Sequence, residues 1–375
     1  MFKKTIFWSH LIVGVSLGLL ILLLSITGAI LVFDNQFRDR AFTNEYSIIP
    51  EENRLSLNSI VNLPEITLDE RKPKSIIIYP EKTDSLRFAF GHGSFLFVNP
   101  YNGEILGNHR IKTINFMNSV FLLHGSLVPF FSMETRNNGQ SLTGITNLSV
   151  LFLLISGMYL WLPKIFKWKF FKRNIFFDRS VLNNSKKRDH NWHLVLGFWS
   201  SIPLLIIVVT ATFMEYDWAL KIKNSLAENF IGTEEVEKVI VLNPSEYSAL
   251  NIKENNLDNL VHKFKNEYPK WQSIMISLPI SNVRPLKLTV DEGNGRQPQK
   301  RTVFSINQYT SEILKITPFS AKSKSDQNLF LRFLHTGEVF GLTSQIIAMI
   351  TSLFCIVTIW CGLALAFRRL ILSKL

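Results

Sequence analysis

Charged residues are missing from four long stretches of this 375-residue chain, and their absence defines the class of protein. Residues 5–33, 137–163, 191–214 and 339–367 contain no Lys, Arg, Asp or Glu. Each stretch reaches the ~20 residues that a helix needs to cross a bilayer. A soluble globular protein and a mostly disordered chain are therefore excluded. Gly and Pro, at 18 and 14 residues, are too few for a collagen-like or low-complexity chain.

Cysteine is scarce as well. The chain has 2, Cys355 and Cys361, both in the fourth uncharged stretch. On a helix this spacing corresponds to a rotation of roughly 240°, so the two side chains are expected to face different ways. We interpret them as packing residues rather than a disulfide or a metal site. The sequence also lacks a catalytic Ser/His/Asp or Cys/His signature, a Gly-rich phosphate loop and a dinucleotide fingerprint.

Basic residues predict the orientation of the chain in its membrane. The connection 164–190 is short and carries nine Lys and Arg against two Asp. Short basic loops stay in the cytoplasm, so this loop and both termini are expected inside. Together these segments hold 14 basic and 2 acidic residues, and the net charge of +12 therefore resides there. This charge indicates membrane topology and contact with anionic lipid, and a nucleic-acid partner is not expected.

The first stretch, 1–33, is interpreted as an uncleaved transmembrane helix, because its apolar run is longer than that of a signal peptide and no small-x-small site follows. Thr113–Met133 is also uncharged, but a crossing there would move the basic loop outside, so we expect a surface helix carrying His124. The predicted organisation is transmembrane helix 1 over 1–33, a periplasmic region over 34–136, helix 2 over 137–163, the cytoplasmic loop 164–190, helix 3 over 191–214, a second periplasmic region over 215–338, helix 4 over 339–367 and a cytoplasmic tail over 368–375.

The two halves of the chain repeat one pattern. His10-Leu-Ile-Val-Gly14 matches His193-Leu-Val-Leu-Gly197, and in both halves a Thr follows 17 residues after the His and an Asp 24 residues after it. A Leu-His pair, with His124 or His335, precedes the second and fourth stretches. Both copies start on the same side, so the sequence predicts a parallel repeat.

Short apolar runs in the two long connections predict small α+β regions. Leu257–Tyr268 has helical spacing. The expected strands are Ser75–Tyr79, Leu86–Phe90, Phe95–Asn99, Ser273–Leu278, Leu286–Val290 and Thr302–Ile306.

Four histidines lie at equivalent places in the repeat. His10 and His193 are near the cytoplasmic ends of predicted helices, and His124 and His335 are near the periplasmic ends. An ionisable residue at membrane depth is a functional hypothesis by default. Two imidazoles from different helices can ligate a haem iron from both sides, and such an iron suits electron transfer. The alternative, that these His only hydrogen-bond across helices while Gly permits close packing, stays open.

The remaining charged and small residues extend this hypothesis. His190 precedes His193 by one helical turn and is an alternative ligand or a propionate partner. Small residues near the four histidines leave room for a flat macrocycle: Gly14, Gly18, Gly125, Gly197 and Gly337. Arg38, Arg110 and Arg332 are candidate propionate partners. The other histidines, His92, His109 and His262, lie in polar stretches and are interpreted as solvated.

Several motifs together carry a family resemblance. They are His10…Gly14…Ser25-Ile-Thr27-Gly28, Leu123-His124-Gly125, Ser156-Gly157-Met-Tyr-Leu-Trp161-Leu-Pro163, His193…Gly197 and Phe97-Val-Asn-Pro-Tyr-Asn-Gly103-Glu. Their order resembles the PepSY-associated transmembrane helix family, of the iron-regulated or siderophore-reductase type. In the second half, Thr210-Ala211 stands in place of Thr27-Gly28, and Cys361-Gly362 stands in place of Ser156-Gly157.

The resemblance implies a bacterial inner-membrane protein with four transmembrane helices and two periplasmic α+β PepSY-like regions. Some members of the family are di-haem reductases that release iron from ferric siderophores. By resemblance, His10, His124, His193 and His335 are the ligands of two b-type haems.

We therefore expect an α-helical integral membrane protein, with four helices in two parallel repeats, that transfers electrons to a ferric siderophore or another ferric chelate in the periplasm. The sequence has no flavin or nicotinamide site, so it does not distinguish quinol from a cytoplasmic reductase as the electron donor. The alternative is a haem-free sensor, inhibitor or assembly partner. A transporter is disfavoured, because none of the four stretches carries an acidic residue.

Overall fold

The computed structural model describes residues 1–67, 72–91, 94–107, 111–128, 130, 132–163, 167–232, 240–243, 245, 257–281 and 283–372. The chain forms two compact units. We call the first the helical unit; it contains Met1–Asp34, Phe116–Phe230 and Asn328–Leu375. We call the second the sheet unit; it contains Asn35–Asn115 and Ile231–Gln327.

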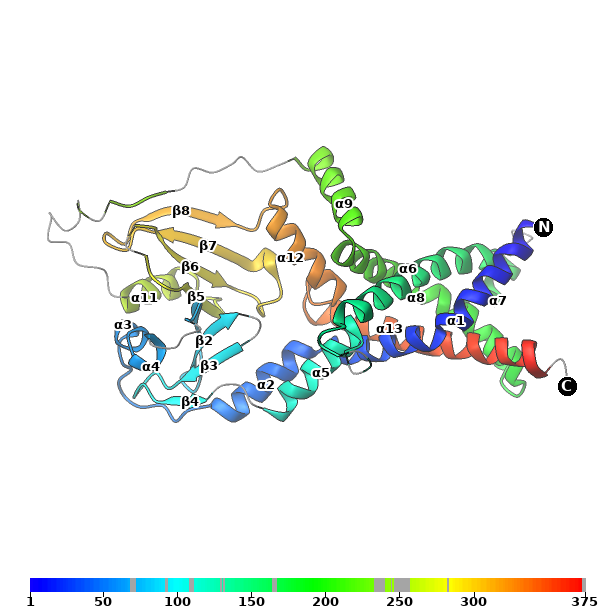
Figure 1. Ribbon diagram of the computed structural model, residues 1–375, viewed down its shortest axis with the longest axis horizontal. Helices are drawn as coiled ribbons and strands as arrows, with labels where there is room; N and C mark the ends of the chain where they lie inside the picture. Colours follow the sequence, from blue (N-terminus) through cyan, green and yellow to red (C-terminus); the bar gives the residue numbers. More distant parts are fainter. Residues whose placement is uncertain are drawn as a thin grey trace. The chain divides into compact units, whose positions relative to one another are not determined.

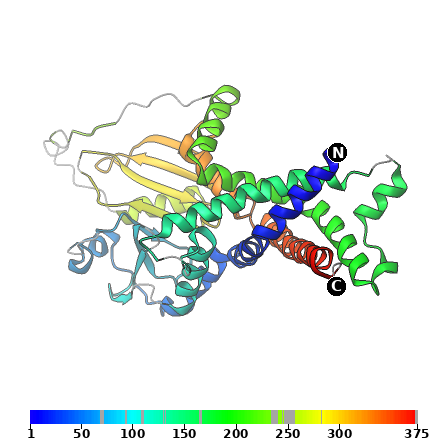
Figure 2. The ribbon, with the colours of Figure 1, turned by 45° about the vertical axis from the view of Figure 1, so that its right-hand side comes forward.

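Four long apolar helices dominate the helical unit, and each is long and apolar enough to cross a membrane. They form a bundle in which α1 and α8 each contact both α6 and α13 (Figure 1). Figure 2 shows α1, α6 and α13 from a second side. The four predicted membrane helices are confirmed as helices, and the chain is a multi-pass membrane protein. Their bounds are α1 Phe2–Leu31, α6 Arg136–Trp161, α8 Ser185–Glu215 and α13 Leu342–Phe367.

The third long helix begins earlier than the sequence predicted. We expected it over 191–214, but α8 begins at Ser185 and takes in the last residues of the predicted basic loop. The side chain of Asn184 accepts a hydrogen bond from the backbone amide of Lys187, which caps the first turn. A polar first turn is compatible with a helix that extends beyond the hydrocarbon layer.

Shorter helices accompany the bundle. Between α6 and α8 lie α7 (Trp168–Ile175) and the 3₁₀ turn η1 (Arg179–Val181). The helix expected within Thr113–Met133 is present as α5 (Lys112–Ser126), shorter than the uncharged segment that suggested it. The remaining short elements are α9 Asp217–Phe230, α12 Lys324–His335 and the π-helical end η3 Arg368–Leu372.

The sheet unit contains one antiparallel sheet of 8 strands in the order β4-β3-β2-β1-β5-β6-β7-β8 (Figure 1). All six strands expected from the sequence are confirmed, with bounds that differ by one residue. The strands are β1 Ser75–Ile78, β2 Leu86–Gly91, β3 Ser94–Val98, β4 Ile105–Gly107, β5 Ser273–Ser277, β6 Leu286–Asp291, β7 Arg301–Ile306 and β8 Ile313–Pro318.

The strands of the two predicted regions join at the middle of this sheet. β1 pairs with β5, and residues 75–78 lie opposite residues 277–274. Without this pairing, β1 and β5 would each be an open edge, which a sheet protein must cover or pair. The two long connections of the sequence therefore contribute to a single sheet.

Helices from both connections cover one face of the sheet. They are α3 (Leu57–Val61), α4 (Pro64–Thr67) and α11 (Leu257–Glu267), and their core includes the fully buried Phe88, Phe264 and Phe304. α3 and α11 cap each other: the Leu57 amide donates to Asp258, and the Leu257 amide donates to Asn58. Such side-chain caps satisfy backbone donors that the first turn of a helix leaves unpaired.

A fourth helix packs on the other side of the strands. α2 (Asp34–Tyr46) contributes Ala41, Phe42 and Tyr46 to a smaller cluster. Its centre is Phe97 of β3, whose ring stacks on that of Tyr46 with centroids 4.1 Å apart. Adjacent residues of a strand point to opposite faces, so β3 serves both cores.

The central pairing can be tested by crosslinking. Ile77 and Met275 are direct partners across β1 and β5, and opposite residues in an antiparallel pair place their Cβ atoms about 4.5–5.5 Å apart. With Cys355 and Cys361 replaced by Ala, Ile77→Cys/Met275→Cys should therefore oxidise to an internal disulfide, visible as faster migration on a non-reducing gel. The control is Ile77→Cys/Thr289→Cys, which places the second cysteine one strand further away on β6. Equal crosslinking of both pairs would contradict the strand order.

Candidate functional site

Two pairs of histidine rings lie close together within the helical unit. His10 of α1 and His193 of α8 have ring centroids 6.4 Å apart. We call them the first histidine pair. α1 and α8 share the neighbours α6 and α13, so these rings meet across the interior of the bundle.

The second pair is built from shorter helices. His124 of α5 and His335 of α12 have ring centroids 6.5 Å apart. Burial, with a smaller contribution from the neighbouring His335, lowers the pKa of His124 to about 4. Burial likewise lowers the pKa of His335. Both imidazoles are therefore neutral at physiological pH, which is the form that binds metals.

The two pairs lie at different levels of the bundle. Thr27, which contacts His124, follows His10 by 17 positions on α1, a rise of about 25 Å at 1.5 Å per residue. On α8, Ile207 contacts His335 and follows His193 by 14 positions, a rise of about 21 Å. This separation is comparable with the hydrocarbon thickness of a bilayer, about 30 Å.

In the first half of the chain, hydroxyl groups hold the histidine rings. His10 Nδ1 lies 2.8 Å from Ser156 Oγ of α6, and His124 Nδ1 lies 2.9 Å from Thr27 Oγ1 of α1. Each hydroxyl already donates its proton to a backbone carbonyl one turn earlier in its own helix, at 2.7 Å for Ser156 and 2.8 Å for Thr27. Each hydroxyl must therefore accept, and the histidine Nδ1–H donates.

In the second half of the chain, backbone carbonyls accept the hydrogen bonds from the histidine Nδ1–H groups. His193 Nδ1 donates to the Thr358 carbonyl of α13 at 2.9 Å, and His335 Nδ1 donates to the Ile207 carbonyl of α8 at 2.9 Å. Cys361 stands where the first half has Ser156, and a thiol is a weak acceptor. A carbonyl accepts only, so these two rings also carry their proton on Nδ1.

All four rings therefore have Nε2 without a proton. Among the hydrogen bonds of the described residues, none uses Nε2 of these four histidines. An unprotonated imidazole nitrogen, with the opposite nitrogen fixed by a hydrogen bond, is the arrangement found in metal-ligating histidines.

Glycine residues provide space beside three of the rings. A Cβ atom added at Gly157 would lie 3.2 Å from His10 Cε1, one at Gly28 would lie 3.3 Å from His124 Cε1, and one at Gly362 would lie 3.2 Å from His193 Cε1. In each case the contact is tighter than a side chain normally accepts. The two hydroxyl-Gly dipeptides, Thr27-Gly28 and Ser156-Gly157, therefore act as units: the hydroxyl holds the ring and the glycine gives it room.

The other histidines are placed differently. His190 is exposed, whereas the ring of His193 lies next to His10. His262 is exposed on α11, and its Nδ1 accepts a hydrogen bond from Asn266 at 3.3 Å. His92 and His109 lie outside the described residues, as does Arg110.

The two remaining arginine candidates belong to different units. Arg332 is exposed on α12, one helical turn before His335, which suits a residue that binds an anionic group beside that ring. Arg38 lies on α2, in the sheet unit.

A buried ion-pair cluster near the first pair was not predicted from the sequence. Asp189, one turn before His193 on α8, accepts hydrogen bonds from Arg188 at 2.9 Å and from Arg368 at 2.6 Å. Asp189 is 4% exposed, although the sequence suggested only a loop charge. Its ion pair with Arg368 ties α8 to the end of α13, the two helices that carry His193 and Thr358.

No group of three or more His, Cys, Asp and Glu side chains that could hold a metal ion occurs among the described residues. Both cysteines are buried and free, as the sequence suggested, and Cys355 Sγ accepts a hydrogen bond from Ser25.

Comparison with known families agrees with the sequence motifs. The family described as "PepSY-associated TM region" matches residues 7–369. The match covers nearly the whole chain, including all four long helices, and confirms the family expected from the motifs. No curated protein matches the sequence.

The tautomers of the histidines can be measured directly. In ¹⁵N-histidine-labelled protein prepared without haem, the four paired histidines should show a protonated Nδ1 and a bare Nε2. His262 should show the opposite tautomer, because its Nδ1 is an acceptor, and it provides an internal control. Ser156→Ala should shift only the His10 signals. Protonated Nε2 signals from the paired histidines would contradict the site.

Proposed function

The chain belongs to the PepSY-associated TM region family, and we propose that it is a di-haem b electron-transfer protein of the bacterial inner membrane. In this proposal the first histidine pair ligates one haem, the second pair ligates the other, and the protein reduces a ferric siderophore or another ferric chelate. The observation that carries the proposal is the separation of the rings in the two pairs.

That separation fits a shared metal. A metal–imidazole bond is about 2.0–2.1 Å long, and the bonding nitrogen lies about 1.1 Å from the ring centre, so two imidazoles on opposite sides of one metal have centres about 6.2–6.4 Å apart. The ring centroids lie 6.4 Å apart in the first pair and 6.5 Å apart in the second, at the upper end of that range. Packed aromatic rings have centroids about 4.5–7 Å apart, so the distance supports a shared metal only together with the bare Nε2 atoms and its near-equal value in both pairs.

The surroundings of the rings support the same assignment. Each Nδ1–H has a fixed acceptor on a neighbouring helix, which orients the ring and makes Nε2 a better ligand. Gly28, Gly157 and Gly362 keep side chains away from three of the rings. A flat macrocycle between helices needs oriented rings that lie close to the helix backbones. The hydrogen-bonding alternative also uses glycine for close packing, but it does not require a bare Nε2 on all four rings.

A haem b held by two of these histidines would supply reversible one-electron chemistry and would leave no position for oxygen. The chain's own residues provide the rest. The helices hold the imidazoles neutral and in place, and the apolar bundle excludes water from the ligands. Arg332 is suitably placed to pair with a propionate near His335, and Arg188 and Arg368 are candidates near His193.

Two sites at different levels suit electron carriage through a membrane. We propose that the basic segment 164–190 and both termini lie in the cytoplasm, as their 14 basic and 2 acidic residues suggest. The first pair then lies near the cytoplasmic face and the second near the periplasmic face. The sheet unit lies in the periplasm in this orientation. The electron donor would be quinol or a cytoplasmic reductase.

The acceptor is proposed from family resemblance and from the chemistry of iron. Hard oxygen ligands bind Fe(III) tightly and Fe(II) weakly. One electron delivered from the protein reduces Fe(III) to Fe(II), and the chelate then releases its iron. No residue of the described chain distinguishes one chelate from another.

Haem ligation can be tested by visible spectroscopy of the purified protein. We expect reduced b-type bands from two haems. His10→Ala and His193→Ala should lose the same haem, and His124→Ala and His335→Ala should lose the other. His190→Ala and His262→Ala should keep both haems.

Ser156→Ala should weaken haem binding about 10–100-fold. Ser149→Ala is the matched control, since the Ser149 hydroxyl bonds only within α6. A folded but colourless protein from haem-replete cells would exclude the proposal.

Reductase activity needs a separate measurement. Protein reduced with dithionite and freed of excess reductant should be reoxidised by a ferric chelate, with Fe(II) appearing in proportion to the haem oxidised. The gallium(III) form of the same chelate has the same shape but no accessible redox chemistry, and it should leave the protein reduced. If no ferric chelate reoxidises the protein, the reductase assignment is wrong even where the haem assignment holds.

A further inference from the structure

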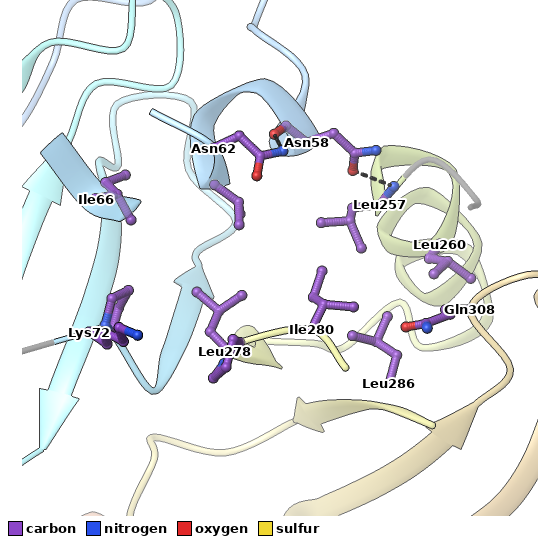
Figure 3. A pocket seen from close by; sticks show the side chains of 13 residues that line it. Asn58, Asn62, Ile66, Lys72, Leu257, Leu260, Leu278, Ile280, Leu286 and Gln308 are labelled. Atoms are coloured by element: carbon purple, nitrogen blue, oxygen red, sulfur yellow. Dashed lines mark hydrogen bonds between the residues drawn. The ribbon is translucent and has the colours of Figure 1, made fainter. Parts of the chain in front are cut away.

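A cavity of about 400 Å³ lies within the sheet unit, between α3 and α11 (Figure 3). Ligand pockets for small organic molecules have about 300–1,000 Å³, so this volume lies in their range. Residues from both long connections of the chain line it. Its walls are mainly aliphatic and include Val61, Ile66, Leu257, Leu260, Ile280 and Leu286.

The walls of the cavity are fixed by contacts already described. α3 and α11 cap each other through Asn58 and Asp258, and Leu257, Leu260 and Leu286 belong to the main core of the sheet unit. Side chains held in a core cannot simply move inward to close the space. The cavity is therefore part of the folded sheet unit.

One polar group inside this apolar wall lacks a partner. Gln308 is 4% exposed, and its Nε2 donates to the Ser281 carbonyl at 2.7 Å. Its Oε1 has no hydrogen-bond partner among the described residues and points into the cavity (Figure 3). Turning the amide over would face its oxygen toward the Ser281 carbonyl, two acceptors in contact, so the orientation is fixed.

A buried acceptor without a donor is unfavourable. The turn after β7 holds Gln308 in place, because the preceding Asn307 side chain accepts the backbone amide of Tyr309 at 2.9 Å. The turn holds the backbone of Gln308 beside the cavity, and the bond to the Ser281 carbonyl holds its side chain there. A ligand with an N–H or O–H group would satisfy Gln308 Oε1.

The rim of the cavity has a different chemistry. Lys72 and Asn62 line it and are exposed. Asn62 Nδ2 donates to the Asn58 carbonyl at 2.8 Å, which leaves its oxygen facing the cavity (Figure 3). The Lys72 ammonium favours an anionic group at the rim, where water still reaches it.

We propose that this cavity binds a small amphipathic anion. Its apolar body would fill the aliphatic space, an N–H or O–H group on that body would donate to Gln308 Oε1, and its anionic group would pair with Lys72 at the rim. This site is separate from the histidine pairs and does not depend on the proposed redox function.

Indole-3-propionate matches this description and serves as the probe. Its indole N–H is the donor, and its carboxylate is the anion. The matched control is benzothiophene-3-propionate, which has a similar shape and the same charge but no N–H. Both should be titrated by calorimetry into the full chain in lipid nanodiscs, with empty nanodiscs subtracted. We expect the indole to bind about fivefold to tenfold more tightly, as for one hydrogen bond to a buried acceptor.

Variants assign the contacts. Gln308→Leu should abolish the preference for the indole, since the acceptor is removed. Lys72→Gln should weaken both probes equally, and Lys287→Gln, an exposed charge on β6, should change neither. Leu286→Trp should block both probes. The comparison of the two probes on the unaltered protein requires no variant to fold. Absence of binding, equal affinities there, or an indole preference that survives in Gln308→Leu would overturn the proposal.

Discussion

The hydrogen bond from each histidine Nδ1 to a neighbouring helix is the interaction on which the candidate site depends. A ring on a single helix can rotate about two side-chain bonds. Here an acceptor on a second helix fixes it: Ser156 for His10, Thr27 for His124, and backbone carbonyls for His193 and His335. The same bond sets the tautomer, so ring orientation and ligand chemistry have one cause. It also links helices in lipid, where apolar burial contributes little to their association.

The helical bundle is arranged so that no single helix makes a site. At the level of the first pair, α1 and α8 provide the rings, while α6 and α13 provide the acceptors and the space beside them. Gly157 follows Ser156 directly, and Gly362 lies one turn after Thr358, so support and space come from the same segments. Asp189 and Arg368 then fix α8 against α13 at that end of the bundle. Displacing any of these helices would alter the ring separation.

The sheet unit has an analogous dependence on both halves of the chain. Pairing of β1 with β5 joins strands about two hundred residues apart in sequence, and the helices that cap each other come from the same two segments. The cavity lined by Gln308 exists because these halves meet. The turn after β7 holds Gln308 Oε1 inside this apolar wall. A buried acceptor of this kind is unfavourable unless a donor pairs with it.

Sequence alone determined the membrane helices, six of the eight strands, the family and the four paired histidines. These features follow from local properties of the sequence. They are the length of the uncharged stretches, the alternation of apolar and polar residues in strands, and the matched spacing of His, Thr and Gly in the two halves. β4 and β8 were missed because both are only partly buried and lack clear alternation. The start of α8 was misplaced because its capped first turn is charged.

Tertiary structure alone decided which histidine rings form pairs and which acceptor holds each ring. It also decided that Asp189 is buried and that the two connections share one sheet. Each of these depends on contacts between segments distant in sequence, and no local pattern of residues records the distance between two helices.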